Sequence, residues 1–150
     1  MSTETGINLR VGLSSTRTHV VGGPDLATNW QNEVEVLSTP ILLWLAEITC
    51  MSAIAEAMTP PWMTVGAAHT VQHMAPTPEG FVVSITATLV EIDRRRLVFE
   101  VSAHDGVETI LTGRHERFLV DGDKFRARVT AKGETHGPGA PSPEAAACTL

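Results

Sequence analysis

Glu47 is the residue of this sequence best placed to do chemistry. It stands in an apolar stretch, where its neighbours three and four positions away on a helix are Leu43, Trp44, Cys50 and Met51. These surroundings remove water, which disfavours a charged carboxylate unless hydrogen-bond donors compensate. Glu47 is therefore a candidate acid, base or nucleophile. The alternative is a structural role, in which it faces a gap in the fold or pairs across a dimer.

Thr39 lies eight residues before Glu47, at the start of the same apolar stretch. A threonine here caps a helix, and this role needs no further explanation. A helix N-terminus also offers free N–H groups and positive potential, which suit an oxyanion or a carboxylate. At ~1.5 Å per residue the two residues lie about 12 Å apart along the helix axis. They could flank one substrate, but they could not hydrogen-bond to each other.

His69 and His73 fall on one face of a predicted strand, with a spacing that invites a zinc interpretation. Residues four apart on a strand are separated by roughly 13 Å, whereas zinc ligands lie about 2 Å from the ion. We therefore predict no metal site, and no cofactor. His73 ends the strand, where the alternative to a catalytic role is a surface or structural one. Gly66, inside the same strand, marks a bulge or a close approach to the backbone.

His115 and Arg117 fall on one face of the last predicted strand, and Glu116 falls on the other. Charged residues inside a strand usually mark a solvated face. Arg117 could instead reach a carboxylate such as Glu47 or an acyl substrate. The sequence has no GxSxG, no glycine-rich phosphate loop and no CxxC. Nothing therefore supports nucleotide binding through those motifs.

A long apolar helix is predicted over residues 39–58 to position Glu47. Thr39 is expected as its cap and Pro40 at its first helical position, and residues 59–61, Thr-Pro-Pro, end it. Apolar residues occur on all sides of this helix, which predicts that the rest of the fold wraps it. Glu47 and Glu56 argue against a transmembrane interpretation, so no membrane partner is expected.

Alternating apolar and polar residues predict strands around this helix. The expected strands cover parts of residues 9–21, 64–73, 81–92, 97–103 and 107–120, with a hairpin turn at Asp105-Gly106. Residues 27–38 are expected to form a lid-like segment or a short helix. The pattern predicts an α+β fold, with an antiparallel sheet curled around one helix. A single sheet leaves such a helix partly open, so a homodimer that completes the enclosure is expected.

The length of 150 residues suits one domain, for which we predict a flexible N-terminus over 1–8, a folded domain over 9–130 and a disordered tail over 131–150. A net charge of −6 and the lack of tyrosine argue against a nucleic-acid partner. Cys50 falls in the apolar helix and Cys148 in the tail, which favours a cytoplasmic protein over a disulfide-bonded one. The first ten residues contain no signal-peptide pattern.

Three segments together resemble a known family. These are residues 101–129, residues 65–80 with His73 before a Thr-Pro-x-Gly turn, and the helix with Thr39 and Glu47. In this order and spacing, they resemble the fluoroacetyl-CoA thioesterase family of hot-dog folds. The likeness covers about residues 10–129.

The resemblance implies that the chain hydrolyses acyl-CoA thioesters as a dimer with Thr39, Glu47 and His73. Gly66 and Arg117 match positions that contact the substrate. On this basis Glu47 either activates water or attacks the thioester carbonyl itself, and both roles stay open. The alternatives are a hot-dog protein that binds an acyl-CoA or a small acid without hydrolysis, and an acyl-CoA hydratase.

One departure from the family concerns the acyl group. Its fluoroacetate-selective member carries phenylalanines in the segment before the helix, whereas residues 27–38 here contain Trp30 and no phenylalanine. This difference favours a broader or different short acyl group over selectivity for fluoroacetyl.

Overall fold

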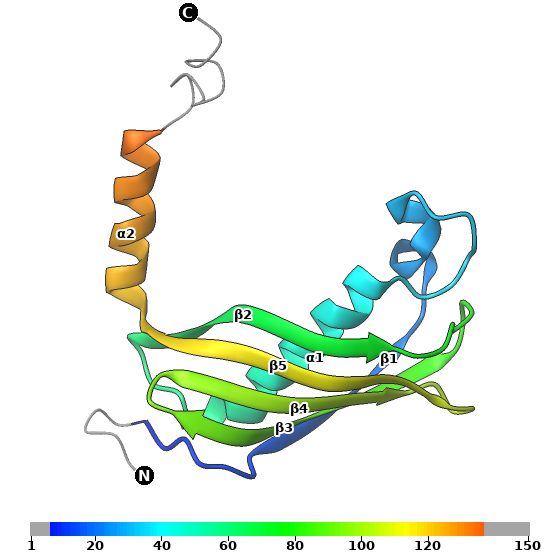
Figure 1. Ribbon diagram of the computed structural model, residues 1–150, viewed down its shortest axis with the longest axis horizontal. Helices are drawn as coiled ribbons and strands as arrows, with labels where there is room; N and C mark the ends of the chain where they lie inside the picture. Colours follow the sequence, from blue (N-terminus) through cyan, green and yellow to red (C-terminus); the bar gives the residue numbers. More distant parts are fainter. Residues whose placement is uncertain (1–6, 137–150) are drawn as a thin grey trace, which may run out of the picture.

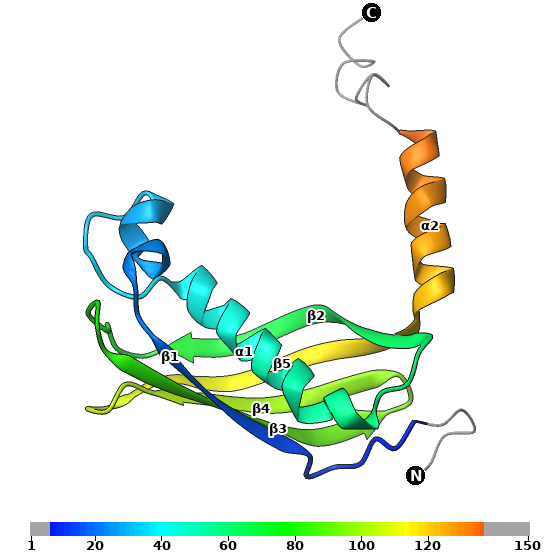
Figure 2. The ribbon, with the colours of Figure 1, turned by 180° about the vertical axis from the view of Figure 1, so that it is seen from behind.

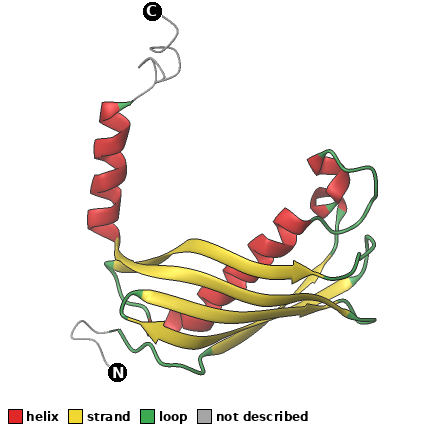
Figure 3. Cartoon of the chain, viewed as in Figure 1, coloured by secondary structure: helices red, strands yellow, loops and turns green. Residues whose placement is uncertain are grey.

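One antiparallel sheet curves around a single long helix in the computed structural model, which describes residues 7–136 (Figures 1 and 2). The helix is α1 (Thr39–Ile54), and the five strands are β1 (Ser14–Val20), β2 (Trp62–His73), β3 (Val82–Asp93), β4 (Arg96–His104) and β5 (Thr109–Asp121). Their order in the sheet is β1-β3-β4-β5-β2, so β1 and β2 are the edge strands. The predicted α+β architecture, with a sheet around one helix, is confirmed (Figure 3).

The start of α1 differs by one residue from the prediction. Ser38, with extended backbone angles, is the N-cap, and Thr39 is the first helical residue. Pro40 lies in the first turn, where its missing N–H costs no hydrogen bond. The predicted end at Met58 is also modified, because the chain tightens after Ile54 into the 3-10 helix η3 (Ala55–Ala57).

One side of α1 packs on the sheet, mainly on β3 and β1. The buried side chains of the helix are Leu42, Leu45, Ala46, Thr49, Cys50 and Ile54. On the other side Trp44 is 50% exposed and Met51 is 45% exposed, with Glu47 one turn from each. A single chain therefore covers α1 on one side only, as expected for one sheet, and apolar residues on the other side stay exposed. Helix periodicity reports which residues are apolar, and it does not separate a core face from an interface.

The stretch Thr39–Ala57 is long and apolar enough to cross a membrane by length and composition alone. Packing of α1 in the hydrophobic core accounts for the same composition, because its buried residues join those of β3, β4 and β5 in one cluster. Strand β3 shows the predicted alternation, with Val83, Ile85, Ala87 and Leu89 all buried on the helix side.

The segment between β1 and α1 contains two short 3-10 helices, η1 (Gly23–Asp25) and η2 (Ala27–Trp30). Residues 31–38 follow as a loop, held by backbone bonds from Leu37 N–H to the Thr77 carbonyl and from Ser38 N–H to the Asp25 carbonyl. This segment lies beyond the N-terminal end of α1 (Figure 2). The position suits the predicted lid.

A second helix, α2 (Gly122–Thr135), follows β5 and stands away from the sheet (Figure 1). Its N-cap is Asp121, whose carboxylate accepts hydrogen bonds from the N–H groups of Asp123 and Lys124. Residues 131–135, predicted as part of a disordered tail, are the end of this helix, and residues 137–150 lie outside the described residues. The polar composition of α2, without a buried face, hid it from a pattern search.

The folded part of the chain includes residues before the predicted boundary at residue 9, and residues 1–6 of the predicted flexible N-terminus lie outside the described residues. Ile7 is buried in the core cluster, and the N–H of Asn8 donates to the carbonyl of Ala57 at the end of η3. These two residues therefore belong to the folded domain.

Candidate active site

Thr39 and His73 meet where α1 begins and β2 ends. The Oγ1 atom of Thr39 lies 2.8 Å from Nδ1 of His73, a hydrogen bond between residues 34 apart in the chain. Because Ser38 is the N-cap, the hydroxyl of Thr39 has no capping role. Two of the three predicted catalytic residues are therefore in direct contact.

A pocket of about 450 Å³ opens beside this pair. It lies between the lid segment, the first turn of α1 and the end of β2, and its lining includes Ala27, Trp30, Val36, Thr39, His73 and Met74. This volume is within the range of roughly 300–1,000 Å³ that small-molecule sites occupy. The walls are mostly apolar, and the polar groups of Thr39 and His73 converge at one point.

Burial lowers the pKa of His73 below its ordinary value of 6.5, against an opposing hydrogen bond with the backbone of Ala75. The imidazole is therefore neutral at neutral pH. Its Nε2 atom is buried and has no partner among the residues that the structure describes. A neutral ring that hydrogen-bonds to Thr39 is able to transfer or share a proton at that hydroxyl.

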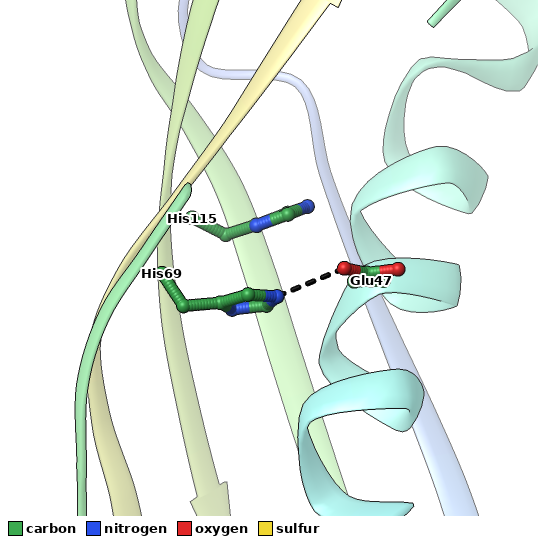
Figure 4. A group of neighbouring side chains, drawn as sticks. All are labelled: Glu47, His69 and His115. Carbon is green, nitrogen blue, oxygen red and sulfur yellow. Dashed lines mark hydrogen bonds and ion pairs between the residues drawn. The ribbon is translucent and has the colours of Figure 1, made fainter. Parts of the chain in front are cut away.

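Glu47 lies apart from this pair, two turns further along α1. Its Oε1 atom accepts a hydrogen bond from Nε2 of His69 at 2.9 Å (Figure 4). The side chain of Glu47 is 35% exposed and that of His69 is 21% exposed, so solvent reaches the carboxylate in a single chain. Within one chain the structure therefore pairs Glu47 with His69 and not with His73.

Sequence reasoning missed this pair, although the signal was present. The strand pattern put His69 and His73 on the same face of β2, which is the face toward α1. Only the crossing of α1 over β2 decides which histidine faces Glu47, and the sequence pattern does not contain that angle.

His115 stacks on His69, with ring centroids 4.1 Å apart and an angle of 20° between the planes. Its Nδ1–H donates to the carbonyl of Ala68 at 2.9 Å, and its Nε2 accepts from Nη1 of Arg117 at 3.1 Å. Burial, followed by the nearby His69, lowers the pKa of His115 to about 4. This ring is neutral at neutral pH, in agreement with one donating and one accepting nitrogen.

Arg117 is only 4% exposed, so the solvated-face interpretation of this strand is wrong for its inward side. Besides His115, its guanidinium donates from Nε to Oγ1 of Thr64 at 2.9 Å and from Nη2 to the Thr64 carbonyl at 3.1 Å. Glu116 points the other way and pairs with Arg96. The predicted contact of Arg117 with Glu47 is electrostatic. Burial lowers the pKa of the Arg117 guanidinium, and the Glu47 carboxylate opposes that effect.

Gly66 lies where Glu47 and Arg117 approach β2. A Cβ atom on this glycine would lie 3.1 Å from Oε1 of Glu47, 3.4 Å from Nη1 of Arg117 and 3.5 Å from Cε1 of His115. The pairing of β2 with β5 also shifts register between Gly66 and Ala68. Both predictions for this glycine, a bulge and a close approach, are confirmed.

Glu47, His69 and His115 each offer an atom that binds metals, and these atoms lie within 4.8 Å of one another. This group differs from the His69–His73 pair that strand geometry excluded. Because Arg117 donates to Nε2 of His115, the lone pair that a metal would need is already used. A cation here would also lie next to a buried guanidinium, so the donor set does not suit a metal ion.

Comparison with known proteins identifies the family of this chain. Residues 21–123 match the family model described as fluoroacetyl-CoA-specific thioesterase. A fluoroacetyl-CoA thioesterase from Streptantibioticus cattleyicolor is 42% identical over 98 residues, which cover 65% of this chain and 70% of the relative.

Solved structures show the same relationship. A structure of the fluoroacetyl-CoA thioesterase FlK superimposes with a TM-score of 0.78 at 36% identity, covering 83% of this chain and 98% of the other. A hot-dog-like protein from Thermanaerovibrio acidaminovorans has a TM-score of 0.76 at 24% identity over 81% of this chain and 91% of its own, which supports the fold alone. This chain thus belongs to the fluoroacetyl-CoA-specific thioesterase family of acyl-CoA thioester hydrolases, and its fold is the hot-dog fold.

Proposed function

We propose that this protein hydrolyses the thioester of a small acyl-CoA to the free acid and CoA. The observation that carries the proposal is the hydrogen bond between Thr39 and His73 at the wall of the 450 Å³ pocket. In a chain of this family, a polar pair at the start of a helix and inside an apolar pocket suits an acyl thioester.

Thr39 binds the carbonyl oxygen of the thioester in this proposal, and His73 holds the Thr39 hydroxyl. The carbonyl oxygen becomes an oxyanion when a nucleophile adds. Nδ1–H of the neutral His73 ring donates to Oγ1 of Thr39, and the Thr39 hydroxyl donates its own proton to the oxyanion. Pro40 has no N–H, so Thr39 and Ile41 supply the free N–H groups of the first turn. The positive end of α1 favours the same charge.

Glu47 supplies the nucleophile, by one of two routes. As a base, its carboxylate takes a proton from water, and the hydroxide adds to the thioester carbonyl. As a nucleophile, its carboxylate adds directly and forms an anhydride that water then opens. On both routes the tetrahedral adduct collapses with loss of the CoA thiolate, which takes up a proton to give free CoA.

A homodimer brings these groups together. The separation of about 12 Å along α1 prevents Thr39 and Glu47 of one chain from acting on the same carbonyl carbon. Strand β2 is an edge of the sheet, and the strip of α1 with Trp44 and Met51 is exposed. Long free edges and exposed apolar strips favour pairing with another chain.

When two β2 strands pair antiparallel about a twofold axis, His73 at the end of one strand lies near Gly66 of the other strand. Thr39 and His73 of one protomer then face the partner's Glu47. Each dimer contains two such composite sites.

The acyl group is small and is not restricted to fluoroacetyl. Trp30 lines the pocket, and the segment before α1 contains no phenylalanine. We further propose a cytoplasmic enzyme without a membrane or nucleic-acid partner. The net charge of −6 and the buried free thiol of Cys50 support this setting.

The test is release of free thiol from a panel of short, branched and aryl acyl-CoAs. The wild-type protein should turn over at least one member, and Glu47→Gln should lose most of that rate. His104→Gln, at an exposed histidine that does not line the pocket, is the control and should keep it. Tight acyl-CoA binding by calorimetry without thiol release would contradict hydrolysis and would favour a binding protein.

A further inference from the structure

His69 contacts the carboxylate of Glu47, and neither Thr39 nor His73 does so within the chain. A carboxylate only accepts hydrogen bonds when it is ionised, so Nε2–H of His69 is the donor at 2.9 Å. The bond holds Oε1 of Glu47 and leaves Oε2 for another partner. Because Glu47 is 35% exposed, a substrate or a water molecule is able to reach it.

His69 is itself fixed by its neighbours. It stacks on His115, whose two nitrogens are bonded to the Ala68 carbonyl and to Arg117. Arg117 is in turn held by two bonds to Thr64. This arrangement joins β2, β5 and α1, and every member from Arg117 to Glu47 has a defined partner.

The other ring nitrogen of His69 supports a specific tautomer. Nδ1 is buried and has no hydrogen-bond partner among the described residues. A proton on Nδ1 would leave a buried donor unsatisfied, which costs free energy. When the ring carries one proton, that proton therefore lies on Nε2 and points to Glu47.

We propose that His69 is a positioning residue of the thioesterase site, which orients Glu47 by holding one carboxylate oxygen so that the other faces the substrate. The inference rests on the proposed function of Glu47. Gly66 serves the same end, because a side chain at that position would push against Oε1. The arrangement fixes the carboxylate before the substrate binds, which is how a positioned base or nucleophile gains rate.

The experiment uses two substitutions that separate the ring from the donor. His69→Phe keeps an aromatic ring to stack on His115 and removes the N–H, whereas His69→Gln loses the ring and keeps a donor near the same place. His104→Gln is the matched control at an exposed histidine. Steady-state kinetics with the best acyl-CoA and thermal melting are measured for all variants.

We expect His69→Phe to lower kcat about tenfold, with KM changed by less than about twofold, because the lost bond is to a charged group. His69→Gln should stay within a few-fold of the wild type. In a Glu47→Gln background, His69→Phe should have no further effect, since both changes act on one group.

Three results would overturn the proposal. Unchanged kcat in His69→Phe would show that the hydrogen bond to Glu47 does not matter for turnover. A His69→Gln variant as slow as His69→Phe would show that the hydrogen-bond donor does not matter for turnover. Loss of wild-type activity in EDTA with recovery in Zn²⁺ would assign His69, Glu47 and His115 to a metal instead. A wild type that turns over no acyl-CoA would contradict the proposed function together with this role. That result is distinct from the three above, in which the wild type is active.

Discussion

Thr39 is the side chain in which a catalytic and a structural role are most clearly separated. The N-cap role belongs to Ser38, and among the residues that the structure describes the threonine hydroxyl bonds to His73 alone. Its removal should therefore change chemistry more than stability.

Thr39→Val keeps the shape of the side chain and removes the hydroxyl. We expect kcat/KM to fall about a hundredfold, the usual effect of losing one oxyanion donor. The melting temperature should stay within about 3 °C of the wild type, because no cap is lost. Thr39→Ser is the control and should keep most of the activity. Loss of activity in both variants would point to a steric role instead.

His115 gives the protein a stability that depends on pH. Burial, with His69 next, lowers its pKa from 6.5 to about 4 in the folded chain. Between these values the unfolded chain binds a proton that the folded chain does not, so the unfolding free energy falls as the pH falls through this window. The loss is about 1.4 kcal/mol per pH unit for one such group.

His115→Asn removes this titration and keeps a donor for the Ala68 carbonyl. Urea denaturation across the window should show a smaller change of unfolding free energy with pH than in the wild type. Equal slopes for the two proteins would contradict the assignment.

Cys50 has no part in the proposed chemistry. Burial raises the pKa of its thiol to about 12, against a smaller opposing effect of Arg117, and the side chain is not exposed. In a Cys148→Ser background, Cys50 is the only cysteine in the sequence. Iodoacetamide at mildly alkaline pH should modify it in urea and not in the native protein. Rapid labelling of the native protein would show that this part of the core opens to solvent.

At the scale of elements, β2 carries residues of both parts of the proposed site. It ends at His73 beside the pocket and carries Gly66 and His69 beside Glu47. Its bulge after Gly66 shifts the residues that follow by one position relative to β5. Gly66 on β2 and Gly113 on β5 have different functions, and a substitution at each position tests them separately.

Gly66→Ala places a methyl group 3.1 Å from Oε1 of Glu47, which must move by a few tenths of an ångström. We expect a large loss of kcat with a modest loss of stability. Gly113→Ala on β5 is the comparison, because φ is +146° there and the added Cβ would lie 2.2 Å from the carbonyl oxygen of Thr70. That variant should fail to fold. Circular dichroism and thiol release separate the two effects, and full activity of Gly66→Ala would contradict the close approach.

The sequence predicted the elements better than their contacts. Alternation located β3, β4 and β5, and Pro40 located the start of α1. The pairing of Glu47 with His69 was missed because it depends on how α1 crosses β2. Helix α2 was missed because its signal was a single cap, Asp121, ahead of a polar segment.

At the scale of the molecule, the exposed strip of α1 and the free edge of β2 are the features that a single chain leaves unexplained. The apolar composition of α1 predicted a helix enclosed on all sides, whereas the chain encloses only one side. The proposed homodimer through β2 would cover the strip and would bring Thr39 opposite the partner's Glu47. One assembly would thus account for the apolar surface and for the distance between the proposed catalytic groups.

The purified heterodimer of Thr39→Val and Glu47→Gln chains, each with its own tag, tests this claim most directly. Each variant homodimer has two defective sites and should be nearly inactive. In the heterodimer, one composite site combines an intact Thr39 with an intact Glu47, and the other site lacks both. We predict about half of the wild-type turnover per dimer. A heterodimer as inactive as its parents would place each site within one chain and contradict the account.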